Sequence, residues 1–169
     1  MKSNRGFFNR YELPLFFLLT YLLSWISVPF AGGGLIPHGP FLAAVIMISI
    51  TSGKMGLRQF WRRITRFRAG WYYIIGPAVI AAYLGAAYVL AHLLGARPGH
   101  PPQFPSLAIL TQLLLLGGLW EEPGWTGYAL PKLQERTAAK RHGRLLAALI
   151  LGSFRAIWHI PLFLYGTLP

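Results

Sequence analysis

The sequence has no cysteine, no aspartate and only four glutamates. The lack of cysteine excludes disulfides, thiolate metal sites and a cysteine nucleophile. Charged residues make up 12% of the chain, about half of the usual share in soluble domains, whereas 54% of the residues are hydrophobic. The apolar residues gather in stretches that are too long and too free of charge for a globular core. They therefore predict a multi-pass integral membrane protein.

The few charges are mostly of one sign, because sixteen Lys and Arg residues give a formal net charge of +12. In a soluble protein this excess would indicate nucleic-acid binding. Here six of the basic residues lie between two hydrophobic stretches: Lys54, Arg58, Arg62, Arg63, Arg66 and Arg68. Basic residues in such a place mark the cytoplasmic side of a membrane and meet anionic headgroups. We therefore expect membrane lipids as partners, and no nucleic acid.

Charge-free stretches, separated by polar or Pro/Gly-rich segments, predict an all-α transmembrane bundle of about five spans. A span needs roughly 20 apolar residues. The second predicted span is short, and the fourth is interrupted by two carboxylates. The five predicted spans are residues 13–29, 41–52, 69–96, 106–130 and 145–169. We expect a single membrane domain over residues 1–169, in the cell membrane.

The basic residues also predict the orientation. Three Lys or Arg residues precede the first span, six follow the second, one follows the third and five follow the fourth. Since cytoplasmic loops carry the excess of Lys and Arg, this alternation predicts a cytoplasmic N-terminus. No convincing cleavage pattern precedes Ala31, so the first span is expected to be a retained helix.

Four ionisable residues fall within predicted spans, where charges are costly and often functional. Glu121 and Glu122 interrupt the fourth span, and Arg155 and His159 interrupt the fifth. At about 1.5 Å per residue, the carboxylates lie about 15–17 Å from the cytoplasmic edge, Arg155 about 15 Å and His159 about 21 Å. Arg155 and His159 share one helix face because they are four residues apart. All four side chains can therefore meet.

Two interpretations of this cluster are open. A carboxylate and an imidazole beside a wet cavity can activate a water as general base and proton shuttle. Two adjacent carboxylates raise each other's proton affinity, which suits chemistry better than packing. The alternative is structural: one glutamate pairs with Arg155, and His159 hydrogen-bonds to a backbone carbonyl. The other histidines show no metal-ligand spacing.

Two runs in the C-terminal third carry a specific pattern. The first is Glu-Glu-Pro-Gly-Trp at 121–125 with Gly-Tyr-Ala-Leu-Pro at 127–131, and the second is Trp-His-Ile-Pro at 158–161 after a basic linker. Over residues 117–169 the sequence resembles the CPBP family. These are intramembrane proteases related to CAAX prenyl endopeptidases and to bacteriocin-processing or abortive-infection proteins. The resemblance implies an all-helical endopeptidase that cuts a peptide or protein substrate in a cavity open to the membrane.

The resemblance also implies roles for the polar residues. The family's first motif is EExxxR, so Glu121 would activate the water and Glu122 would support it, while the second-motif histidine falls on His159 and would help to position the water. Members have been called metalloproteases, although a glutamate-activated water without metal describes the CAAX proteases better. No cofactor is certain, and a divalent metal such as zinc is left open, with Glu121 and His159 as its ligands if one is present.

Three departures from the family pattern stand out. Thr126 occupies the position of the motif-one arginine, and Arg155 occupies the aromatic position four residues before the histidine. The third motif, a later His followed four residues on by Asn or Asp, would lie beyond Pro169. We therefore expect a C-terminally truncated chain, and we expect Arg155 to pair with Glu122 in place of the arginine missing at Thr126. The alternative function is a non-catalytic membrane protein of the same fold that acts in bacteriocin immunity or partner binding.

Overall fold

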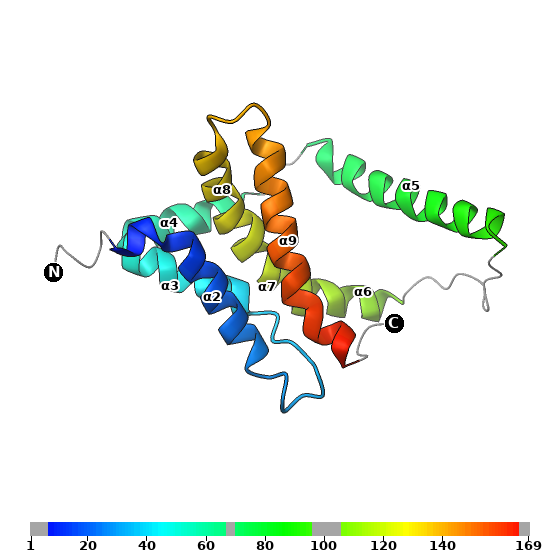
Figure 1. Ribbon diagram of the computed structural model, residues 1–169, viewed down its shortest axis with the longest axis horizontal. Coiled ribbons are helices and arrows are strands. Elements are labelled where there is room, and N and C mark those ends of the chain that lie inside the picture. The colour runs from blue at the N-terminus through cyan, green and yellow to red at the C-terminus, as the bar shows by residue number, and fades with distance from the viewer. Residues whose placement is uncertain (1–6, 67–69, 96–105, 166–169) are drawn as a thin grey trace. The chain divides into compact units, whose positions relative to one another are not determined.

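The computed structural model describes residues 7–66, 70–95 and 106–165. Every regular element in these ranges is a helix, which confirms the predicted all-α class (Figure 1). Contacts divide the chain into two compact units, Met1–Thr65 with Ala108–Pro169 as the first and Arg66–Leu107 as the second. A single membrane domain stays a prediction.

The second unit holds one long helix, α5 (Tyr72–Leu93), which corresponds to the third predicted span. Every side chain from Ile74 to Leu93 is exposed. Among the described residues of the unit none covers this apolar surface, as expected for a helix whose solvent is lipid. Trp71 directly precedes the helix and is exposed, and the side chains of Tyr72 and Tyr73 lie outside the described part.

Two described helices are long and apolar enough to cross a membrane, namely Ile74–Leu93 within α5, and α9 (Gly143–Leu164). The first and second predicted spans form shorter apolar helices, α2 (Glu12–Trp25) and α3 (Gly39–Thr51). A helix of 14 residues rises only about 21 Å, which is less than a bilayer core of about 30 Å. Five spans and a cytoplasmic N-terminus therefore stay predictions.

Small side chains bring α2 and α3 close together. A Cβ atom added at Gly39 would collide with the Ser24 side chain and come within 2.8 Å of the Thr20 carbonyl oxygen. Ala43 and Ala44 continue the same buried face of α3. Small residues of this kind let the backbones of membrane helices approach closely.

The basic segment after the second predicted span forms a further helix, α4 (Gly53–Ile64). Sequence analysis predicted its charge but not its helix. Gly53 has a φ of +61°, a left-handed conformation that glycine adopts readily, and it separates α3 from α4. The helix is amphipathic, with Phe60 buried in the core and Arg58 and Arg62 exposed.

The fourth predicted span is helical throughout but irregular. The chain runs through α6 (Leu107–Leu113), the π-helix η1 (Leu114–Gly118), α7 (Leu119–Glu122), the π-helix η2 (Pro123–Ala129) and α8 (Leu130–Thr137). Pro123 and Pro131 lack the N–H group that an α-helical turn requires. Such π-helical turns inside helices are frequent at functional sites.

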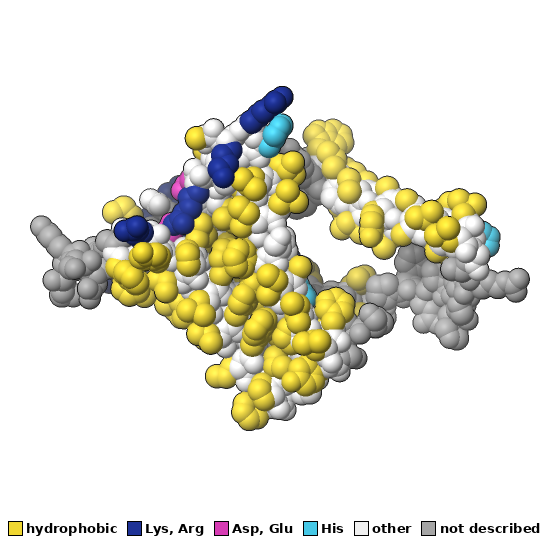
Figure 2. Space-filling view, in the orientation of Figure 1, with side chains coloured by type: hydrophobic (Ala, Val, Ile, Leu, Met, Phe, Trp, Pro, Cys, Tyr) yellow, Lys and Arg dark blue, Asp and Glu magenta, His cyan; other side chains and the backbone are white. Residues whose placement is uncertain are grey.

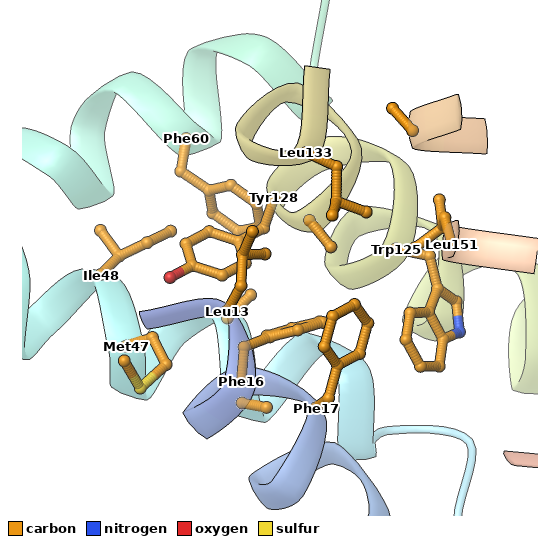
Figure 3. Packing of buried hydrophobic residues seen from close by; sticks show 14 of the residues in the cluster. Leu13, Phe16, Phe17, Met47, Ile48, Phe60, Trp125, Tyr128, Leu133 and Leu151 are labelled. Carbon is orange, nitrogen blue, oxygen red and sulfur yellow. The ribbon is translucent and has the colours of Figure 1, made fainter. Parts of the chain in front are cut away.

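Aromatic rings and aliphatic side chains together form the core of the first unit (Figure 3). Phe16 of α2 contacts Trp125 and Tyr128 of η2, with ring centroids 5.8 and 5.0 Å apart. Phe17 of α2 stacks on Phe154 of α9 at 3.9 Å. Because three elements share one set of rings, the packing fixes η2 and α9 against α2.

Two hydrogen bonds hold α2 to the backbone of α9. The hydroxyl of Tyr21 donates to the carbonyl oxygen of Phe154 at 2.8 Å, and Trp25 Nε1 donates to that of Trp158 at 3.0 Å. The two donors are one helical turn apart on α2, and the two acceptors are one helical turn apart on α9. The two bonds therefore fix a whole turn of α9.

A row of Lys and Arg side chains runs over α8 and the start of α2, beside a broad hydrophobic surface (Figure 2). Lys132 of α8 forms an ion pair with Glu12 of α2 at 2.8 Å. The row lies at the end of the helices that sequence analysis assigned to the cytoplasmic edge.

Candidate active site

The candidate site lies between α7 and α9. Glu121 and Glu122 end α7, and the next turns belong to η2, whose Gly124 leaves no room for a Cβ atom against the backbone of Pro40. Trp125 of η2 and Trp158 of α9 are both fully buried, with ring centroids 6.0 Å apart. This packing fixes α9, which carries Arg155 and His159, against η2, which follows directly on the two glutamates of α7.

Arg155 of α9 joins the two carboxylates of α7. Its Nη2 atom lies 2.6 Å from Glu122 Oε1 and 3.5 Å from Glu121 Oε2. The predicted contact between Arg155 and Glu122 is thereby confirmed. The Glu121 side chain is 16% exposed, whereas those of Glu122 and Arg155 are 41% and 37% exposed. Glu121 is therefore the more enclosed carboxylate.

His159 lies one turn beyond Arg155 on the same helix. Its Nδ1 atom is 2.8 Å from the carbonyl oxygen of Arg155, and since a carbonyl can only accept, Nδ1 carries the proton in this bond. Nε2 is then the nitrogen that can accept a proton. The ring packs edge-on against Trp158 at 4.8 Å.

Thr126 is placed differently from the charged residues. Its hydroxyl donates to the backbone carbonyl of Glu122 at 2.8 Å, and its side chain is exposed. Any support that it gives to Glu122 therefore acts on the backbone carbonyl at the end of α7, not on the carboxylate.

Arg63 is a residue near the site that sequence analysis counted only among the basic residues at the membrane edge. Its Nη1 atom donates to the carbonyl oxygen of Gly127 at 3.2 Å. Arg63 also lines a groove of about 310 Å³ together with Glu122 and Thr126. One feature of the sequence could have indicated the contact between Arg63 and Gly127. Pro131 lacks the N–H group that an α-helical turn would direct at the Gly127 carbonyl.

The residues at the site do not fit a zinc centre. A zinc site normally has three or four converging protein ligands. Within the described ranges no group of three or more His, Asp or Glu side chains is placed to hold a metal ion. In addition, Arg155 occupies oxygen atoms of both Glu121 and Glu122.

Comparison with known proteins gives a family for this part of the chain. Residues 102–169 match the family model of type II CAAX prenyl endopeptidases, Rce1-like. A segment of 50 residues is 42% identical to a protein of Methanococcus maripaludis named CAAX prenyl protease 2. The segment covers 30% of this chain and 17% of that protein. No solved structure matches the chain. The resemblance to the CPBP family is thus confirmed for the C-terminal part of the chain, which is similar to the Rce1-like CAAX prenyl endopeptidases.

Proposed function

We propose that this chain is an intramembrane endopeptidase of the CAAX-protease type, in which Glu121 activates a water molecule. The observation that carries the proposal is the position of Arg155, which bridges the two carboxylates of α7 and is followed one turn later by His159. Two carboxylates and a cation thus meet, and an imidazole lies one turn away on the helix of the cation. Charges within a membrane are costly, and where they occur they often mark a functional site.

In the proposed reaction, Glu121 takes a proton from water while the water oxygen bonds to the carbonyl carbon of the peptide. The carbonyl electron pair moves to its oxygen, and a tetrahedral intermediate forms. The electron pair then returns from the oxygen to re-form the carbonyl, the carbon–nitrogen bond breaks, and the nitrogen receives the proton held by Glu121. The products are a carboxylic acid and an amine, and Glu121 is again a carboxylate. His159 Nε2 would accept a hydrogen bond from the water and orient it. Arg155 would offset the repulsion between the adjacent carboxylates.

The proposed substrate is a peptide or protein that reaches the site within the cell membrane. The chain would cross this membrane several times. The name of the methanogen relative points to prenylated CAAX sequences as its substrates. A prenylated CAAX peptide is therefore the first probe for this chain.

One observation favours a second candidate, a non-catalytic protein that binds a membrane partner. Arg155 contacts Glu122 at 2.6 Å and His159 bonds to a backbone carbonyl, which are the contacts expected of purely structural residues. In this case the same fold would bind a peptide without cutting it.

The test compares the chain with its Glu121→Ala, His159→Ala and double variants in lipid vesicles, using a fluorogenic prenylated CAAX peptide. We expect each single change to abolish turnover, and the double variant to lose no more than either single one, because both residues act on one water. Glu135→Ala is the matched control, since Glu135 is an exposed carboxylate on α8.

Substantial turnover in either single variant would remove the proposed site. If the unaltered chain binds the peptide but never cleaves it, the second candidate is correct.

A further inference from the structure

Arg63 is held in a fixed direction by the backbone of η2. It reaches from the last turn of α4 to the carbonyl oxygen of Gly127, at 3.2 Å. The bond uses one of the five N–H donors of the guanidinium group. The Arg63 side chain is exposed, so its other donors reach the surface of the groove that it lines.

The groove is lined by one cation and one carboxylate, Arg63 and Glu122. Arg63 is bonded to Gly127, which follows Glu122 by five residues along the chain. Apart from Thr126, the other lining residues are apolar or glycine and include Ile64 and Pro123. A guanidinium fork matches the geometry of a carboxylate, with which it can form two parallel hydrogen bonds. Arg63 thus offers a carboxylate site in the same groove as Glu122, one residue of the candidate active site.

We propose that Arg63 binds the C-terminal carboxylate of the peptide substrate, with the last residues of the peptide lying in this groove. The inference rests on the proposed protease function. Gly127 lies five residues beyond Glu122, about 7 Å along a helix axis. An extended peptide covers about 3.3–3.6 Å per residue, so two or three residues span this distance. Arg63 would therefore set how far from its end a substrate is cut.

Arg63 differs in this respect from the other arginines of α4. Arg58 and Arg62 are exposed and do not line the groove, which suits contacts with lipid headgroups. The carboxylate of Glu122 would repel an anionic headgroup in the groove. It would not repel the scissile bond of a peptide, because that bond is neutral. Arg62 is therefore a matched control, one residue away on the same helix.

The experiment measures binding in a Glu121→Gln background, so that no cleavage is needed. Fluorescence anisotropy in neutral detergent micelles compares two prenylated CAAX peptides that differ only in a free or an amidated C-terminus. We expect the free acid to bind at least about tenfold more tightly, as is usual for a charge-assisted hydrogen-bond pair. Arg63→Gln should abolish this preference, Arg63→Lys should retain part of it, and Arg62→Gln should retain all of it.

Equal binding of the two peptides by the unaltered groove would overturn the inference without any variant. A preference that survives Arg63→Gln would overturn it as well. If Arg63→Gln instead weakens only binding to vesicles that contain anionic phospholipid, the groove takes a headgroup and the inference is wrong.

The inference and the proposed function fail in different ways. A chain that prefers the free acid through Arg63 but cleaves neither peptide is not a protease, although the inference stands. In a chain that cleaves, Arg63→Gln should raise KM for the free acid and leave that for the amide unchanged. Cleavage of both peptides with equal KM would support the protease and overturn the role of Arg63.

Discussion

Replacing Arg155 by leucine would leave two adjacent carboxylates without the cation that joins them. Exposed ion pairs contribute about 0.2–1 kcal/mol to stability, whereas removing one partner of a buried pair costs about 3–5 kcal/mol. Arg155 and Glu122 are 37% and 41% exposed, and Glu121 is 16% exposed. We therefore expect Arg155→Leu to lower the free energy of unfolding by about 2 kcal/mol, between these two limits.

A second change should reverse much of this loss. Thr126 is exposed and lies one helical turn after Glu122, where the family pattern has its arginine. An arginine four residues from a glutamate can contact it along the same helix. The variant Arg155→Leu with Thr126→Arg should therefore regain much of the stability, because the cation returns to Glu122 from the other side.

The measurement is the thermal unfolding midpoint of the purified chain in detergent, together with folded yield. In a chain of this length 2 kcal/mol corresponds to about 4–8 °C. Arg144→Leu is the control, since Arg144 is an exposed arginine at the start of the same helix, and it should change the midpoint little. If Arg155→Leu is neutral, or if Thr126→Arg restores nothing, Arg155 does not replace the arginine missing at Thr126.

Three further predictions concern the rest of the molecule. A reporter fused at Arg63 should be cytoplasmic and one at Gly99, outside the described residues, should be external; the opposite signals would exclude the predicted topology. Gly124→Ala should lower the free energy of unfolding by about 1–3 kcal/mol, because the added Cβ would collide with the backbone of α3. Gly152→Ala is the control and should not lower it, because Gly152 has open space around it. Equal effects of the two changes in a thermal melt would contradict this packing. Tyr21→Phe should cost about 0.5–1 kcal/mol by removing the 2.8 Å bond to α9, and an unchanged midpoint would show that the bond contributes nothing.

Contacts could be predicted from the sequence for those residues whose positions follow from helical geometry. A constant rise per residue gives the depth of Glu122 and Arg155, and a spacing of four puts His159 on the face of Arg155. The contact between Arg155 and both carboxylates was therefore predictable, and so was the all-α class. Span number, orientation and catalysis stay predictions.

The sequence by itself thus determined the helical class and the charges that meet between α7 and α9, and it predicted a membrane location, because hydropathy and helical periodicity are local properties. Only the tertiary structure decided that α4 packs beside η2 and brings Arg63 to Gly127, since that contact joins residues 64 positions apart. It also decided that Nδ1 of His159 is bonded to the carbonyl of Arg155. The direction of the His159 side chain depends on the surrounding packing, here on the ring of Trp158, and it cannot be derived from helical spacing.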